Sequence, residues 1–342
     1  MTHRMRALRA FVAALLAGAI SFPAAGAQRG PHGVYLSYSD SASGSLDAIV
    51  ADLEASFTRA GWKTLATYTA GVDRDACTYG ARVLVVHSPS YAQTVLAHGP
   101  RAAYAVPVRL AVYQDERGTH IVMANPRSLN RTIVAEESFA DASEALVQGV
   151  GRIVADARRG SGMVREYGEV RDRGLIGRTM GVMAGGPFTD KITEVYSVTG
   201  DSAAVVRRVA RQVWDRLQEL GGSGSWQIRG IYELDLAERG AVVLGVTGLA
   251  AEARAFSIVG AGADEQAKSF RCPGLSHAPA FPIEVVIMSD SGRVRVTLVN
   301  QMYRMKMYFE DAGKMKFAAN MRMPGSIEDE IRRLVTPGAT VP

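Results

Sequence analysis

The residues best suited to chemistry in this sequence are a thiol and an imidazole on one short segment. The stretch "RCPGLSHAP" places Cys272 and His277 five positions apart. The methionines downstream include Met302, Met305 and Met307. Thiolate, imidazole and thioether groups are ligands for soft metals such as Cu(I), and they also bind haem iron. One hypothesis is therefore a copper or haem site in a redox-accessory protein, without the Cys-x-x-Cys-His motif of covalent haem attachment.

The same residues also have a structural interpretation. The methionines are interleaved with aromatic and basic residues in "YRMKMYFE", and the polarisable methionine side chain packs well against aromatic rings. The only other cysteine is Cys77. Cys272 therefore either forms a disulfide with Cys77 or both remain thiols, and spacing alone does not choose between these states.

A third hypothesis is an enzyme site at His87 and Ser88, which follow the apolar run "ARVLVV". Strand ends and loops often carry functional residues. However, the sequence has no Gly-x-Ser-x-Gly elbow, no phosphate-binding loop and no zinc-protease spacing. These absences favour a protein that is not an enzyme.

The first residues of the chain have the pattern of a secretory signal peptide. Arg4, Arg6 and Arg9 precede an apolar run that is too short to span a membrane, and Ala25-Gly26-Ala27 resembles a cleavage site. We expect residues 1–27 to be removed and the mature protein to be periplasmic or secreted. No later stretch is apolar for long enough to predict a membrane span.

The charge of the mature chain is nearly balanced. The full chain of 342 residues has a formal net charge of +5, which becomes +2 when three arginines and no acidic residue are removed with the signal. Nucleic-acid binding depends on clustered cations that neutralise phosphates. The composition therefore does not predict a nucleic-acid partner.

The mature chain contains two similar halves. "VYLSYSDSASGSLDAIVADLEASFTRAGW" begins at Val34, and "VYSVTGDSAAVVRRVARQVWDRLQELGGSGSW" begins at Val195. Each passes from a Val-Tyr strand to an amphipathic helix and ends at a glycine and a tryptophan. Further on, residues 107–125 and 282–300 are two segments of equal length that each read as a β-hairpin around an Asp and Gly turn. The turn glycine is shifted by one place, which predicts different turn types.

This duplication predicts an α+β protein of two tandem repeats, each a mixed or antiparallel sheet with helices packed on one side. We assign residues 33–157 to the first domain, 158–193 to a Gly-rich linker and 194–336 to the second domain. Two copies of one fold also predict an internal pseudo-dimer with approximate twofold symmetry. The sequence leaves the oligomeric state of the whole chain open.

The hairpin and its preceding proline resemble the family called domain of unknown function 302. The first repeat carries "GPRAAYAVPVRLAVYQDERGTHIVMANP", and the second carries the divergent "CPGLSHAPAFPIEVVIMSDSGRVRVTLVNQ". The resemblance implies compact α/β domains, often dimeric, whose biochemical role is not established. Members often have a Cys-Asn-Pro segment after the apolar strand, whereas this sequence has His87 and Ser88 there. Any role of that cysteine should be missing here.

Together these features favour a binding protein for a small ligand or a protein partner. We expect the binding site in the groove between the repeats and at the loop from Cys272 to His277. The candidate ligand contacts are Cys272, His277, Tyr303 and His87. The alternative is the copper or haem protein, with Cys272, His277, Met302, Met305 and Met307 as metal ligands.

Overall fold

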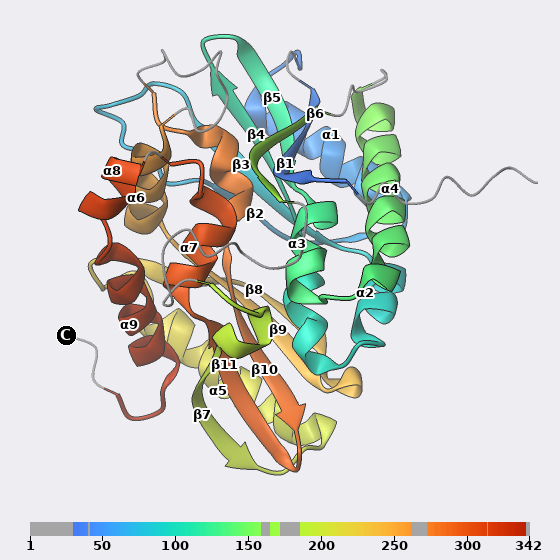
Figure 1. Ribbon diagram of the computed structural model, residues 1–342, viewed down its shortest axis with the longest axis vertical. Helices are drawn as coiled ribbons and strands as arrows, with labels where there is room; N and C mark the ends of the chain where they lie inside the picture. The colour runs from blue at the N-terminus through green and yellow to red at the C-terminus, as the bar shows by residue number, and fades with distance from the viewer. Residues whose placement is uncertain are drawn as a thin grey trace, which may run out of the picture.

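The computed structural model describes residues 30–39, 42–158, 165–171, 185–260, 272–312 and 314–339. The predicted signal peptide, residues 1–27, lies outside these ranges. The described part of the chain forms two antiparallel sheets with helices packed against them (Figure 1). This confirms the predicted α+β class and its two sheet-and-helix units.

The first sheet contains six strands in the order β2-β3-β4-β5-β1-β6. All of its strand pairs are antiparallel. The strands are β1 (His32–Ser39), β2 (Lys63–Thr69), β3 (Ala81–His87), β4 (Val108–Asp115), β5 (Gly118–Ala124) and β6 (Arg165–Arg171). The associated helices are α1 (Leu46–Arg59), α2 (Pro89–Leu96), η1 (Pro100–Ala105), α3 (Pro126–Ile133), η2 (Glu137–Phe139) and α4 (Ala140–Arg158).

The second sheet contains five strands in the order β7-β11-β10-β9-β8. The strands are β7 (Ile192–Thr199), β8 (Ile228–Leu236), β9 (Ala241–Gly248), β10 (Ile283–Asp290) and β11 (Arg293–Val299). The helices are η3 (Phe188–Lys191), α5 (Ala203–Leu220), η4 (Ala237–Arg239), α6 (Leu249–Val259), η5 (Leu275–Ala280), α7 (Gln301–Phe309), α8 (Lys314–Ala319) and α9 (Met323–Val335). Matching elements by chain order gives the same strand order in both sheets, apart from β6.

Corresponding helices begin with the same signals in both repeats. The hydroxyls of Ser45 and Ser202 cap the first long helix of each repeat, α1 and α5. Asn125 and Asn300 cap the helix that follows each hairpin, α3 and α7. The same two cap residue types therefore begin the first long helix and the post-hairpin helix in both halves.

The two hairpins end in different turns, as the shifted glycine predicts. Both have two-residue loops, because Asp115 pairs with Gly118 and Asp290 pairs with Arg293. In the second hairpin both loop residues have positive φ angles, 54° at Ser291 and 78° at Gly292, which is typical of a type I′ turn. In the first hairpin the positive φ is at Gly118 itself, after the loop.

Each repeat packs one short helix on the sheet of the other repeat. The short helix η1 of the first repeat packs on β9 and β10 of the second sheet, and η5 of the second repeat packs on β3, β4 and β5 of the first. Each repeat thus covers part of the other's sheet, whereas α1 and α5 pack against their own sheets.

The segment 158–193, which the sequence predicts to be a linker, also contributes to the fold. Within it, β6 pairs antiparallel with β1 and becomes the sixth strand of the first sheet. Tyr167 of β6 is buried, and its hydroxyl donates to the Ser276 carbonyl of the second repeat at 2.6 Å. Among the described helices, none is long and apolar enough to cross a membrane.

Candidate functional site

The centre of the repeat interface holds a buried ion pair between equivalent residues. Arg109 of β4 and Glu284 of β10 each lie two positions after the proline that opens their hairpin. Arg109 Nη1 contacts Glu284 Oε1, and both residues are no more than 5 % exposed. In a homodimer the same side chain would face itself at this position. The duplicated chain instead places opposite charges there, so this pair joins the repeats.

A second guanidinium, from Arg304 of α7, completes this cluster. Its Nη2 donates to the Pro282 carbonyl at 2.9 Å, and its Nε lies 3.7 Å from Glu284 Oε2. The Tyr308 ring lies between the two arginines, with guanidinium-to-centroid distances of 4.9 Å for Arg109 and 4.8 Å for Arg304. Carbonyls and a ring therefore share the charge that one carboxylate leaves unbalanced. The groups of this cluster are engaged in holding the interface.

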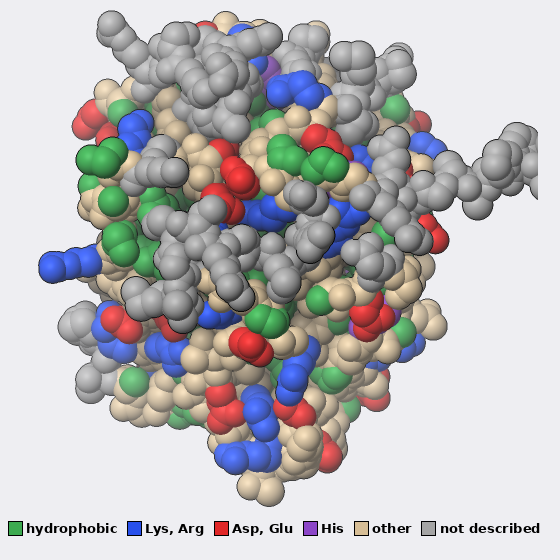
Figure 2. All heavy atoms as spheres, in the orientation of Figure 1, with side chains coloured by type: hydrophobic (Ala, Val, Ile, Leu, Met, Phe, Trp, Pro, Cys, Tyr) green, Lys and Arg blue, Asp and Glu red, His purple; other side chains and the backbone are tan. Residues whose placement is uncertain are grey.

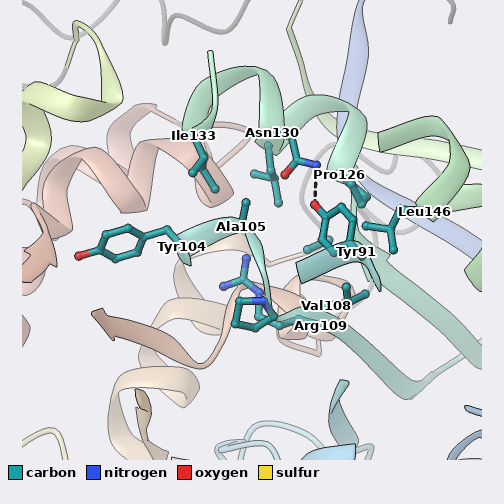
Figure 3. Close-up of a pocket in the computed structure, with 12 residues that line it drawn as sticks. Tyr91, Tyr104, Ala105, Val108, Arg109, Pro126, Asn130, Ile133 and Leu146 are labelled. Atoms are coloured by element: carbon teal, nitrogen blue, oxygen red, sulfur yellow. Dashed lines mark hydrogen bonds between the residues drawn. The ribbon is translucent and has the colours of Figure 1, made fainter. Parts of the chain in front are cut away.

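A small cavity lies beside Arg109 (Figure 3). The guanidinium is drawn between Tyr104 and Tyr91, below Ile133 and Asn130. The space open to the centre of a water molecule is only about 20 Å³, which suits one water rather than a ligand. Arg109 Nε is buried without a hydrogen-bond partner in the described structure, and a bound water would satisfy it.

The three methionines proposed as metal ligands lie on α7, the helix that follows the second hairpin. Where the first repeat has Leu129, Asn130 and Ile133 on α3, the second has Arg304, Met305 and Tyr308 on α7. Met305 and Met307 are 8 % and 2 % exposed. Both methionines belong to the hydrophobic core, and Met302 packs against it. The packing interpretation therefore accounts for these three methionines.

The predicted metal ligands are committed to other contacts. Cys272 forms a disulfide with Cys77, so its sulfur is not a thiolate in this oxidised form. The disulfide resolves the alternative that the sequence left open, and it links the two repeats. Within the described ranges, no three His, Cys, Asp or Glu side chains gather as metal ligands would. The residues proposed for a copper or haem site are thus not assembled into one.

His277 is fully buried and bonded at both ring nitrogens. Its Nε2 lies 2.9 Å from the Asp311 carboxylate, and its Nδ1 lies 3.1 Å from the Ser276 hydroxyl. The ring stacks on Phe309 and meets the edge of Tyr35 at a centroid distance of 4.7 Å. These contacts give His277 a structural role between β1, η5 and α7.

Tyr303 and His87 lie on other elements. The Tyr303 hydroxyl donates to the Gly186 carbonyl at 3.2 Å, and the residue is fully buried. Burial, and then the nearby charge of Lys63, lowers the pKa of His87 to about 4, so the imidazole is neutral at pH 7. Ser88 caps α2 by accepting from the Tyr91 amide at 3.3 Å. The predicted enzyme residues are therefore a buried neutral imidazole and a helix cap.

A separate open groove lies between the repeats. Its volume of about 470 Å³ falls within the usual range for small-molecule sites. One wall follows the end of β2, and the other combines β8 with the start of α6. The described lining residues are Thr69, Ala70, Gly71, Val72, Arg74, Gln227, Arg229, Leu249 and Ala250. The groove thus matches the predicted inter-repeat location, although sequence analysis chose other residues for it.

The groups that line this groove favour the binding of a negatively charged ligand. Arg74 of the first repeat and Arg229 of the second both line it, and none of the described lining residues is acidic. Helix α6 begins here at Leu249, and no side chain of the described residues caps its amides. The N-terminus of a helix carries a partial positive charge and free amides that attract anions. Two guanidiniums and a helix N-terminus from different repeats thus converge on one opening.

A buried carboxyl, Glu252 of α6, holds the floor of the groove together. It accepts hydrogen bonds from the Gly71 amide at 2.5 Å and the Tyr68 hydroxyl at 3.0 Å, both in the first repeat. It also accepts from Thr247 of its own repeat. The backbones meet closely, because a Cβ on Gly71 would lie 2.1 Å from the Leu249 carbonyl oxygen. Glycine at position 71 therefore allows the groove walls to approach.

Glu252 makes stability depend on pH. Burial raises its pKa to about 7 from an ordinary 4.5, against the opposing effect of its hydrogen bonds and Arg229. As pH rises from 4.5 to 7, the unfolded carboxyl loses its proton first, so the folded state loses stability. The loss from this group should be on the order of 3 kcal/mol. Urea unfolding at pH 5 and pH 8 should show that Glu252→Gln removes this loss.

The matched control for this experiment is Glu116→Gln, which removes an exposed carboxyl from the β4–β5 turn. Its difference in unfolding free energy between pH 5 and pH 8 should follow the wild type. If Glu252→Gln also follows the wild type, Glu252 does not hold a proton in the folded state at pH 5.

Comparison with known proteins covers about one third of the chain. The family model described as "Domain of unknown function DUF302" matches residues 38–156, within the first repeat. A solved structure, the uncharacterized conserved protein DUF302 from Bacillus stearothermophilus, is similar at 20% identity. That match covers 34% of this chain and 94% of that chain, with a TM-score of 0.30. No curated protein matches significantly.

Proposed function

We propose that the chain is a periplasmic or secreted binding protein, made of two DUF302-like repeats, that holds a small anionic ligand in the groove between them. The observation that carries this proposal is the convergence of Arg74, Arg229 and the uncapped start of α6 on one opening of about 470 Å³. The ligand class is a small molecule bearing a carboxylate or phosphate group.

The duplication supports treating both halves as copies of one domain. The family model matches residues 38–156, and the second sheet repeats the strand order of the first. The groove needs both copies, because its walls come from β2 of one repeat and from β8 and α6 of the other.

Two features support an extracytoplasmic location. The first 27 residues have the charge and apolar pattern of a cleaved signal. The Cys77–Cys272 disulfide is the form expected in an oxidising compartment.

The copper or haem alternative has weaker support. It needs a free Cys272 thiolate beside His277, whereas the sulfur is bonded to Cys77 and both imidazole nitrogens already have partners. The visible spectrum and metal content of the protein purified from its oxidising compartment test it. Stoichiometric copper or a haem absorption band would revive it.

Calorimetric titration of residues 28–342 with inorganic phosphate, citrate and glucose tests the anion-binding proposal. Citrate or phosphate should bind, and neutral glucose should not. A hydrogen bond to a charged group contributes about 1.5–3 kcal/mol, so Arg229→Ala should weaken binding roughly 10- to 100-fold. Arg74→Ala should act in the same direction, because the two arginines line the same groove.

Arg208→Ala is the matched control. Arg208 is an exposed arginine on α5, where it lines a surface hollow with Arg207 and Arg211 but no second repeat contributes. Its loss should leave citrate affinity unchanged. Equal weakening by Arg208→Ala and Arg229→Ala would indicate diffuse attraction by surface charge, and the proposal would then be wrong.

A further inference from the structure

The two repeats differ at one edge of their sheets. In the first sheet, β1 has β5 on one side and β6 on the other. In the second sheet, the equivalent strand β7 pairs with β11 on one side and forms the edge of the sheet as described. Among the described residues, no strand of the second repeat occupies the position that β6 has in the first.

The pairing of β1 with β6 shows what this position accepts. The two strands run antiparallel, and the register shift between Gly33 and Tyr35 leaves Val34 opposite Gly168 and Glu169, so the extra residue lies on β6. Strand β7 has a register shift against β11 that skips Val195. Val195 corresponds to Val34, because each precedes the tyrosine that starts the repeat pattern. In the first repeat, an irregularity in the pairing at this place is thus compatible with a further antiparallel strand.

The sequence of β7 suits strand pairing. "ITEVYSVT" is rich in β-branched and aromatic residues, and it has no proline or lysine of the kind that protects exposed edges. Glu194 is its only charged residue, and every side chain of the strand is at least partly exposed. An exposed row of backbone donors and acceptors is a template for another strand.

We propose that β7 pairs antiparallel with β7 of a second copy of this chain, around a twofold axis between Val195 and Tyr196. This register places Glu194 of each copy opposite Ser197 of the other. No like charges meet, and the hydroxyl of Ser197, which already donates to Glu194 within one chain at 2.6 Å, can do so across the pair. The strand is self-complementary, which selects a second copy as the occupant.

The described surface around this edge carries no large patch of side chains with the same charge. Figure 2 shows positive and negative side chains interspersed at the lower end of the molecule, where Figure 1 places β7, β10 and β11. Ion pairs there include Arg295 with Glu194 and Arg295 with Asp290. Two copies can approach at this end without strong repulsion. One pair of short strands is a small interface, so the dimer should be weak and concentration-dependent.

Sedimentation of residues 28–342 over about 1 µM to 1 mM tests the dimer. Ser197→Glu would place two glutamates opposite each other on both sides of the twofold axis, and it should raise the dimer Kd roughly 2- to 30-fold. Ser197→Lys would place a lysine opposite Glu194 and should keep or tighten the dimer. Thr64→Glu, on the exposed edge strand β2 of the first sheet, is the matched control and should not change the Kd.

Each outcome decides the proposal. Opposite effects of the two Ser197 variants, with an unchanged control, support pairing in this register. A monomer at all concentrations overturns the dimer. A dimer that responds equally to Ser197→Glu and Ser197→Lys, or equally to Thr64→Glu, overturns pairing through β7.

Discussion

Arg109→Met will lower the free energy of unfolding by about 3–5 kcal/mol, because it deprives a buried carboxylate of its closest partner. Glu284 is 5 % exposed, and Arg109 is its closest guanidinium. The variant also removes the donor to the Tyr308 hydroxyl. Urea-induced unfolding followed by circular dichroism measures the change.

The double variant Arg109→Met/Glu284→Leu tests whether Arg304 depends on the same carboxylate. It leaves the buried Arg304 guanidinium without its described carboxylate partner, so the double variant should be less stable than Arg109→Met alone. The matched control is Arg207→Met, which breaks an exposed ion pair with Asp235 and should leave the stability nearly unchanged. A cost for Arg109→Met no greater than that of Arg207→Met would contradict a structural role for the central pair.

Cys77→Ser/Cys272→Ser will lower the free energy of unfolding by about 2–5 kcal/mol. The bridge joins positions 195 residues apart, and closing a long loop removes much conformational entropy from the unfolded chain. It also ties the loop after β2, which carries one wall of the groove, to the segment before η5. Urea unfolding with and without a thiol reductant measures the effect.

The reductant provides the control for this variant. Reduction should destabilise the wild type by about as much as the double substitution, and it should not change the stability of the double variant. If the wild type is insensitive to reductant under conditions that break the bridge, the disulfide contributes nothing to the stability of the repeat interface.

Much of the fold was accessible from local patterns. The hairpins at residues 107–125 and 282–300 form β4–β5 and β10–β11, and their displaced glycines give the different turns that the sequence predicts. The predicted amphipathic helix of the first half is α1, and its apolar face is buried at Ile49, Val50 and Leu53. Such features depend on the periodicity of neighbouring residues, which a single sequence contains.

Long-range pairings were not accessible in the same way. The charged segment "REYGEVR" lacks a sustained apolar pattern, yet it forms β6. It does so because its backbone pairs with the edge of β1 and the Tyr167 hydroxyl donates a hydrogen bond to η5. The central ion pair could have been predicted from the sequence, because Arg109 and Glu284 have opposite charges at equivalent positions of two aligned hairpins. A charge reversal between repeats at an otherwise apolar strand position indicates contact between the copies.

The binding site stays a prediction, and the groove is lined by residues that the sequence did not single out. The groove lies between the repeats as expected, but it is lined by Arg74 and Arg229 rather than by the loop around His277. Exposed arginines are common on protein surfaces, and only the packing of β2 against β8 brings these two to one opening. His277 attracted attention by its chemical type, which its burial and two polar partners now explain.

Hydrogen–deuterium exchange with saturating citrate is the most direct test of the groove as the binding site. The anion should slow exchange in peptides covering residues 69–74 and 249–252, where the groove walls and the first amides of α6 lie. Arg229→Ala should abolish that protection. Protection confined to other segments, such as the arginine-rich face of α5, or no protection anywhere, would contradict the account.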